Sequence, residues 1–330
     1  MAKTFDNIPL SVLELATVIE GSTPSESFQH AQILAQKVEQ LGYKRFWLAE
    51  HHNMISVASS ATAVLIGYIA AATSTIRVGS GGIMLPNHAP LIVAEQFGTL
   101  ESIYPGRIDL GLGRAPGTDQ VTIRALRRDL MAGMDFPAHV AELRKYFSDQ
   151  NHTALVRAIP GEGLDIPIWI LGSSADSAHL AAALGLPYAF ASHFAPSQLK
   201  AALEIYRLEF RPSDQLNKPY VMACVNIIAA DNDETANYLA TSFQKLFLGI
   251  IKGERKLLQK PDENFELDIM EEMALQQMAR YSFIGGPVTV KNGLQQFIAE
   301  HQVDELMAVT HVYDHEARVH SYELLKAMQS

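Results

Sequence analysis

Short apolar segments alternate with longer amphipathic segments along most of the chain, at intervals of roughly 30 residues. The apolar segments have the length of buried strands, and the longer ones carry apolar residues at helical spacing. The predicted strands lie at residues 9–15, 45–49, 76–78, 107–110, 168–171, 188–191, 220–229 and 306–309. Eight strand–helix units predict an α/β fold, a (β/α)8 TIM barrel, in which residues 1–330 form a single domain. A doubly wound open sheet is the less favoured alternative, because it does not usually need eight such units.

Local signals mark where several predicted helices begin and end. Thr23–Glu26 is a capping box with proline at the first helical position. Gly42 is predicted to end that helix as a left-handed cap, and Gly185 to end a later one. The other predicted helices lie at residues 60–73, 90–103 and 196–210, with a closing helix that ends near residue 328.

Two segments, residues 115–160 and 231–286, interrupt this rhythm and are predicted to be insertions. The first is long and contains several helix formers. The second is polar and lacks a strand signal, so we expect a partly helical insertion near the mouth of the barrel. A solvated connector is the alternative for the second segment.

Composition narrows the class of protein. The chain has 330 residues, 48% of them hydrophobic, and a formal net charge of −10, which argues against a nucleic-acid-binding surface. No apolar run is long enough for a membrane span and no signal peptide is evident, so we expect a cytoplasmic protein. The one cysteine, Cys224, fits a reducing compartment. We expect His311, His315 and His320 to be surface residues of the closing helix.

The segment Phe46–Asn53 leads an apolar strand directly into Glu50, His51 and His52. Active-site residues of barrel enzymes lie at the C-terminal ends of the strands, so this segment predicts a catalytic rim. Successive strand residues point to opposite sides, so only one of the two histidines needs to face the pocket. An imidazole suits acid–base chemistry near neutral pH, with a structural histidine as the alternative. The chain contains no HxH or HExxH spacing, so we expect no metal site.

A further strand end carries glycines and polar residues. Gly79–Gly82 permits unusual backbone angles or the close approach of a flat ligand, with a plain turn as the alternative. Asn87 and His88 can reach the same rim, unless Asn87 caps the helix that begins near Pro90.

Two later loops predict anion binding. Gly111–Gly117 has the spacing GxGxxxG, with Pro116 where a helix would form, so a dinucleotide-binding loop is disfavoured. A loop that brings Arg114 to an anion fits better. Gly172–Ser177 joins a buried strand to a helix, and its N–H groups and hydroxyls predict a phosphate cradle, with serine capping as the alternative.

Four blocks of sequence carry a resemblance to a known family: WLAEHHNM at 47–54, GSGGIMLPNH at 79–88, YPGRIDLGLGR at 104–114 and LGSS at 171–174. The chain resembles the bacterial-luciferase-like flavin monooxygenases, which are TIM barrels, and is most similar to the alkanal monooxygenase branch. The resemblance extends over almost the whole chain.

The resemblance implies roles for particular residues. His51 corresponds to the catalytic histidine, and Gly81–Gly82 to the position of a non-proline cis peptide beside the flavin ring. The residues expected to bind the cofactor are Gly81, Gly82, Asn87, Arg114, Gly172, Ser173, Ser174 and Ser177.

The sequence also departs from luciferase. Ser173 replaces a glutamate, Gly113 replaces a reactive cysteine, and His88 stands one position earlier than its counterpart. These departures bear on the aldehyde substrate and on light emission rather than on the flavin site.

The resemblance implies a monooxygenase that uses reduced FMN and O2 on a small organic substrate, an aldehyde among the candidates, through a C4a-peroxyflavin. A separate flavin reductase would supply the reduced FMN, and the family usually forms homodimers. Two alternatives are a hydride-transfer oxidoreductase that uses the deazaflavin F420, and a flavin-binding protein without catalysis.

Overall fold

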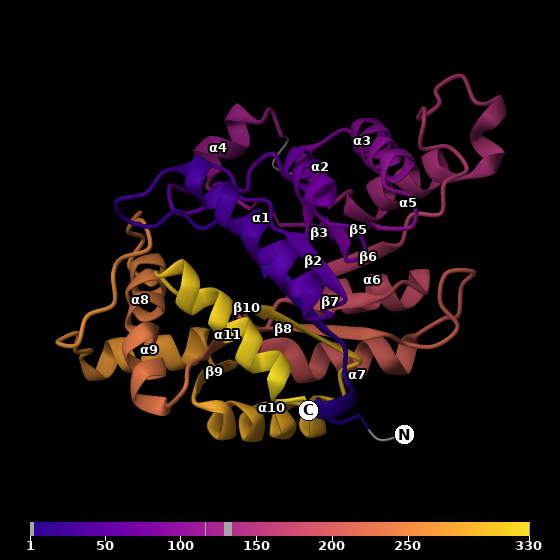
Figure 1. The fold of residues 1–330 in the computed structure, drawn as a ribbon. Helices are drawn as coiled ribbons and strands as arrows, with labels where there is room; N and C mark the ends of the chain where they lie inside the picture. The colour runs from indigo at the N-terminus through magenta and orange to yellow at the C-terminus, as the bar shows by residue number, and fades with distance from the viewer. Residues whose placement is uncertain (1–2, 116, 129–133, 330) are drawn as a thin grey trace.

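The computed structural model describes residues 3–115, 117–128 and 134–329, so Pro116, which the sequence places in the Arg114 loop, lies outside the described residues. Eight parallel strands form a closed barrel (Figure 1). They are β1 (Leu10–Glu14), β2 (Arg45–Leu48), β3 (Arg77–Ser80), β5 (Ile108–Gly113), β6 (Ile168–Gly172), β7 (Tyr188–Phe190), β8 (Val221–Ala229) and β10 (Glu305–Val309). The pairing of β10 with both β1 and β8 closes the barrel. The predicted TIM barrel is confirmed.

Helices surround the barrel, and α1 and α11 lie together over one side of it (Figure 1). The long helices are α1 (Pro24–Gln40), α2 (Thr62–Ala72), α3 (Pro90–Ile103), α5 (Phe136–Phe147), α6 (Ala175–Leu184), α7 (Leu199–Glu209), α8 (Asp233–Ile251), α9 (Ile269–Met278), α10 (Pro287–His301) and α11 (His315–Ala327). A short helix, α4 (Gln120–Ala125), and four 3-10 turns, η1 (Phe5–Asn7), η2 (Leu85–Asn87), η3 (Asp149–Thr153) and η4 (Pro196–Gln198), complete the set. No helix in the described part of the chain has the length and apolar character needed to cross a membrane.

The capping signals in the sequence have the predicted effect. Thr23 and Glu26 form the reciprocal capping box that starts α1. Gly42 and Gly185 have φ angles of 76° and 63°, the left-handed conformation that glycine adopts without steric cost.

The segment 231–286 is mostly helical, as expected, but the expectation that it contains no strand is wrong. It includes α8, α9 and the strand β9 (Ser282–Gly285), which pairs with the second half of β8. The strand is short. It can form because β8 extends past the residues that pair with β7, and the remaining residues of β8 pair with β9. A further short strand, β4 (Ile83–Met84), pairs with β5 and was also not predicted.

The second insertion lies at the mouth of the barrel. Leu258 exchanges backbone hydrogen bonds with Val18 and Glu20, which follow β1, and Arg255 forms an ion pair of 2.7 Å with Asp119, which follows β5. Asp119 also accepts a hydrogen bond from Asn53, the residue directly after His52. The loops at the C-terminal ends of three strands are therefore tied together.

The inside and outside of the barrel have separate cores. A large cluster between strands and helices includes Val12, Phe46 and Val78. A smaller cluster inside the barrel includes Leu13, Trp47 and residues of β6, β7, β8 and β10. Adjacent residues such as Phe46 and Trp47 point to opposite sides, as strand geometry requires.

A buried ionic network occupies the end of the barrel opposite the mouth. The Arg45 guanidinium donates to Asp109 and to Glu305, the second at 2.9 Å, and lies 4.7 Å from the centre of the Trp169 ring. The Trp47 indole also donates to Asp109, at 3.1 Å. Both carboxylates are fully buried. Several partners for each charge offset the cost of removing it from water.

Candidate active site

Four adjacent strands, β2, β3, β5 and β6, each carry one part of the candidate site just beyond their C-terminal ends. His51 follows β2, Gly81–Gly82 follows β3, Arg114 follows β5 and Ser173–Ser177 follows β6. Because neighbouring parallel strands end on the same edge, these residues share one side of the barrel mouth.

The two adjacent histidines have different surroundings. Strand β2 ends at Leu48, but the strand alternation continues, because Trp47 and Ala49 both belong to the cluster inside the barrel. His51 has the same parity and is close enough to His193 for their charges to interact. His52 instead forms a hydrogen bond of 2.8 Å with Glu50. The two imidazoles therefore have different main partners, while their charges also act on each other.

Burial sets the protonation state of His51. Its removal from water lowers the pKa below the usual value, while a hydrogen bond to the backbone of Gly117 and the charge of Glu50 partly oppose this shift. His51 is therefore neutral at physiological pH and can accept a proton.

Glu50 is the centre of a hydrogen-bonded group of side chains that sequence analysis did not predict. One of its oxygens lies 2.8 Å from Nε2 of His52 and 2.9 Å from Nε2 of His88, and the other accepts from the Met84 N–H at 3.0 Å. Asn87 donates to the same carboxylate at 3.4 Å. Asn87 does not cap α3, whose N-cap residue is Ala89, so that alternative is wrong.

The side chains of Glu50, His52 and His88 place three metal-ligand atoms within 4.8 Å of one another. A motif search misses this set because His88 directly follows η2 and does not belong to the loop after β2. In the described structure, the imidazole nitrogens bind the carboxylate directly, and this hydrogen-bonded arrangement accounts for the geometry.

We expect Glu50→Gln to weaken the dependence of stability on acidic pH. Burial opposes ionisation of Glu50, but the hydrogen bonds from His52 and His88 outweigh it and lower the pKa to about 2. Because the pKa of Glu50 is lower in the folded state than in the unfolded state, where it is about 4.3, the ionised carboxylate stabilises the fold at pH values above about 4.3. This stabilisation is lost as the pH falls toward the pKa of the folded state.

Urea unfolding at pH values between 2 and 5 measures this effect, which should be on the order of 3 kcal/mol. Glu316→Gln, at an exposed position on α11, is the control and should keep the parent profile. Parallel profiles for Glu50→Gln and the parent protein would contradict the prediction.

The glycines of β3 and β5 allow these strands and the cavity wall to pack closely. The peptide between Gly81 and Gly82 is cis, as the resemblance implied. A Cβ on Gly81 would lie 2.7 Å from the Leu13 side chain, and a Cβ on Gly82 would lie 2.7 Å from the Gly111 carbonyl oxygen. Gly81 lines a cavity inside the barrel together with Trp47. Close approach, and not a plain turn, explains these glycines.

The loops after β5 and β6 meet at the N-terminus of α6. Arg114, whose side chain is half exposed, forms an ion pair of 3.2 Å with Asp176 in the first turn of α6. Ser174 is the N-cap residue, but its hydroxyl does not cap the helix, so the serine-capping alternative is wrong. The helix N-terminus and the Arg114 guanidinium together fit an anion such as phosphate.

Other residues of the predicted cradle are engaged in structural contacts. The Ser177 hydroxyl donates to the Ser174 carbonyl at 2.7 Å and lies 2.9 Å from the Tyr188 hydroxyl. A Cβ on Gly172 would collide with Ser177, which explains the glycine. Ser173 is half-buried at the turn.

Arg128 connects the Glu50 group, through Asn87, with the Arg114 loop, and no sequence motif predicted this role. Its guanidinium donates to the Asn87 side chain and to the Arg114 carbonyl, both at 3.2 Å. The contact joins residues from three separate loops, so no local motif could identify it.

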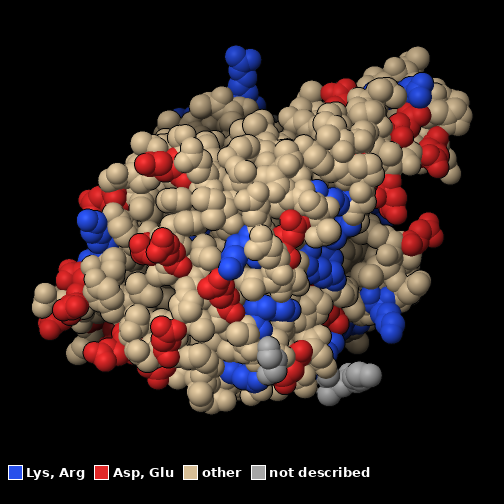
Figure 2. Space-filling model, viewed as in Figure 1, with Lys and Arg blue, Asp and Glu red and all other residues tan. Residues whose placement is uncertain are grey.

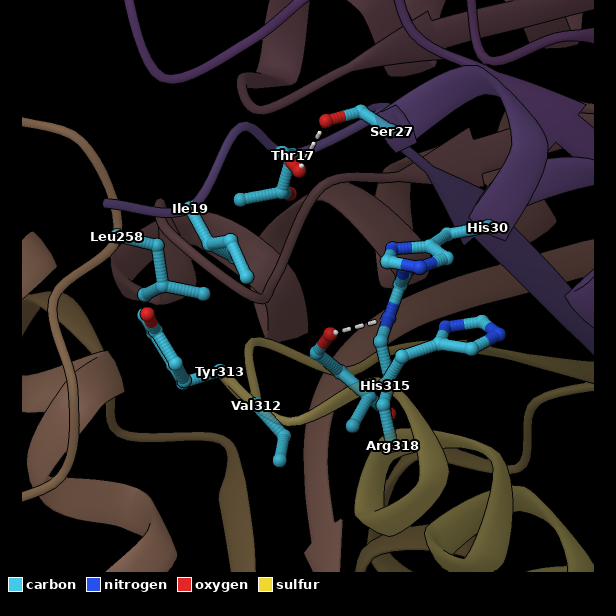
Figure 3. A pocket seen from close by; sticks show the side chains of 10 residues that line it. Thr17, Ile19, Ser27, His30, Leu258, Val312, Tyr313, His315 and Arg318 are labelled. Atoms are coloured by element: carbon cyan, nitrogen blue, oxygen red, sulfur yellow. Dashed lines mark hydrogen bonds between the residues drawn. The ribbon is translucent and has the colours of Figure 1, made fainter. Parts of the chain in front are cut away.

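The C-terminal histidines differ from the expectation. His311 precedes α11 and is buried, because it packs against Phe243 and Phe247 of α8. His315 stacks on His30 of α1 with ring centres 4.1 Å apart, beside a second cavity that Arg318 also lines (Figure 3). His320 alone of the three has a substantially exposed side chain, at 43%.

The closed barrel and the polar residues at its strand ends are those of a TIM-barrel oxidoreductase. The chain belongs to the luciferase-like monooxygenase family, whose model matches residues 10–305. It is 52% identical over 324 residues to a luciferase-like monooxygenase of Escherichia coli K12, which covers 97% of each chain. It is 53% identical over 319 residues to the uncharacterized protein YvbT of Bacillus subtilis, which covers 96% of this chain and 95% of YvbT. The structure of apo-MsnO8 matches with a TM-score of 0.87 and 34% identity, over 98% of both chains.

Proposed function

We propose that this family member is an FMN-dependent monooxygenase acting on a small organic substrate, with the chain working as one domain. The observation that carries the proposal is the sequence of adjacent strand ends that bring together His51, the Gly81–Gly82 wall and Arg114 at the α6 N-terminus. Two solved structures of the same fold, at 15% and 12% identity to this chain, support the proposal, because one is a complex with FMN and the other holds an F420–acetone adduct.

The residues present fit a flavin phosphate at the α6 N-terminus. A phosphate there would replace Asp176 as the partner of Arg114 and Gln198 as the acceptor of the Ala175 N–H in the first turn. The phosphate-side residues are Arg114, Ser173 and Ser174, with Ser177 and Gly172 shaping the turn. Reduced FMN, when bound, would supply the electrons that activate O2.

The chain itself would supply position, exclusion of water and proton transfer. The cavity bounded by Leu13, Trp47 and Met307 has an apolar wall that limits access of water. His51, neutral because it is buried, would accept or return a proton at the reacting centre. Glu50 would orient His52 and His88 at the edge of the mouth.

The direct test supplies a flavin reductase, NAD(P)H, FMN and a panel of small organic substrates, and measures substrate-dependent product formation and O2 uptake. The proposal predicts product only when reduced FMN and O2 are both present. Turnover with reduced F420 and not with reduced FMN would favour the hydride-transfer alternative. Binding of FMN without any turnover of the panel would favour a flavin-binding protein.

We expect Arg114→Ala to lose roughly 1.5–3 kcal/mol of FMN binding, the usual contribution of a hydrogen bond to a charged group. Riboflavin lacks the phosphate, so its affinity should change little. Calorimetry with FMN and riboflavin measures both. Arg157→Ala removes another exposed arginine that pairs with a carboxylate and serves as the control. Equal affinity of the parent protein for FMN and riboflavin would contradict the phosphate site.

We propose that the outer faces of α2 and α3 form a homodimer interface. The exposed residues of these faces include Val64, Tyr68 and Ile92, which are 71%, 39% and 45% exposed. Figure 2 shows few charged side chains over this part of the surface. Exposed apolar patches of this kind mark association sites.

We expect analytical ultracentrifugation to show a dimer for the parent chain. The double variant Val64→Glu, Ile92→Glu should sediment as a folded monomer, because it places charges on the interface. An unchanged dimer in this variant would place the interface elsewhere.

A further inference from the structure

The interior of the barrel changes from apolar to polar toward the mouth. Leu13, Met222 and Met307 line the cavity with Trp47, and none of the described lining residues is acidic or basic except His193. The cavity measures about 310 Å³, including the part open to solvent.

Strand alternation places two polar side chains above the apolar part of this cavity. Ala189, Ala191 and His193 are alternate residues on β7 and its extension, and all three line the cavity. Met222 and Cys224 are alternate lining residues of β8, so Asn226 is the next inward position on that strand. His193 and Asn226 are neighbours, because the Asn226 amide donates to the His193 carbonyl at 2.6 Å.

Buried polar atoms at this level have no partner within the described structure. They are Nδ1 of His193, Oδ1 of Asn226 and Nδ1 of His311. The orientation of the Asn226 amide is fixed, since its nitrogen also lies 3.1 Å from the Ser282 hydroxyl and a backbone carbonyl can only accept. Its oxygen is therefore a true unpaired acceptor. Native proteins rarely leave such groups unsatisfied, and several close together indicate that a ligand satisfies them.

We infer that His193 and Asn226, with His311 beside them, bind the polar group of the substrate, and that this group is uncharged and carries a hydrogen-bond donor. The inference rests on the proposed function for the identity of the ligand as a substrate. The donor is required because Asn226 Oδ1 can only accept. A carbonyl on the same group would accept from an imidazole N–H. A primary or secondary amide on an apolar chain meets both requirements.

Charge selects against an acid at this position. Burial, together with the nearby His311 and His51, lowers the pKa of His193 to about 3. Burial and the nearby Arg318 lower the pKa of His311 to about 3. Both imidazoles are neutral at physiological pH, and Arg318 is already paired with Glu14 at 2.7 Å. A carboxylate bound here would therefore be buried without a compensating charge.

Three isosteric probes test the inference: hexanamide, pentyl methyl ketone and hexanoate. They share one apolar chain and one carbonyl and end in NH2, CH3 and O⁻. We expect calorimetric titration at pH 8, with excess FMN present, to show the tightest binding for hexanamide. The ketone should bind roughly fivefold more weakly, since it lacks the donor, and hexanoate more weakly still.

Asn226→Leu should lose the preference for hexanamide over the ketone while it retains binding of the ketone. His193→Phe should weaken hexanamide and the ketone alike, because both carry the carbonyl that the imidazole N–H would bind. His179→Phe, at an exposed position on α6, is the control and should keep the parent ranking. The parent ranking alone is decisive even if a variant fails to fold.

Hexanoate binding as tightly as hexanamide, or no detectable binding of any probe, would overturn the inference. So would a preference for hexanamide that survives in folded Asn226→Leu. FMN binding, followed in the same samples by flavin fluorescence, separates this result from the proposed function. If FMN does not bind but the probe ranking is as expected, the proposed function is wrong and the binding site at His193 and Asn226 still stands.

Discussion

His51→Ala is expected to lower turnover by roughly 10²–10⁴, the usual contribution of a positioned acid–base group. FMN affinity should stay nearly unchanged, because Arg114 and the α6 N-terminus lie on different strand ends from His51. The measurement is single-turnover oxidation of enzyme-bound reduced flavin by O2 in the presence of a substrate that the panel has identified.

Two other histidine variants make the result specific. His52→Ala should affect stability more than chemistry, because His52 forms its hydrogen bond with the buried Glu50. His152→Ala changes an exposed histidine in η3 and should match the parent in both. If His51→Ala reacts at the parent rate while His52→Ala does not, the catalytic role belongs to the other imidazole.

The pH profile gives a second readout for His51. Burial lowers its pKa, so the neutral form should persist below the usual titration range of histidine. Turnover that requires neutral His51 should therefore fall only at more acidic pH than an exposed histidine would predict.

Asp109→Ala is expected to lower the free energy of unfolding by roughly 3–5 kcal/mol, the cost of leaving a buried charge without its partner. Asp109 is fully buried and receives hydrogen bonds from Arg45, Arg77 and Trp47. Its removal leaves two guanidinium groups and an indole N–H with fewer partners.

Chemical denaturation of the parent and variant proteins measures this change. Glu254→Ala removes a carboxylate from an exposed pair with Lys256 and should leave the midpoint almost unchanged. A midpoint for Asp109→Ala close to that of the parent would show that the network contributes little to stability. Because the network lies at the end of the barrel opposite the mouth, the folded variant should retain FMN affinity.

The sequence alone determined the repeating architecture of this protein. Strand and helix periods are local, so the eight barrel strands, the Thr23–Glu26 capping box and the glycine caps at Gly42 and Gly185 could be placed without the fold. Strand parity is also local, and the two histidines that it assigns to opposite sides have different partners, His193 for His51 and Glu50 for His52.

Only the tertiary structure decided which side chains meet. Barrel closure brings Glu305 to Arg45 across 260 positions. The loops at the mouth bring His88 to Glu50 and Arg128 to both Asn87 and Arg114. The fold also buries His311 beneath α8, where sequence position suggested an exposed helix. These contacts depend on the order in which strands pair and on the loops that close over the mouth. Periodicity along the chain carries no information about such distant pairings. The motifs therefore identified the strand ends that form the site, whereas the side-chain contacts within the site depend on the tertiary structure.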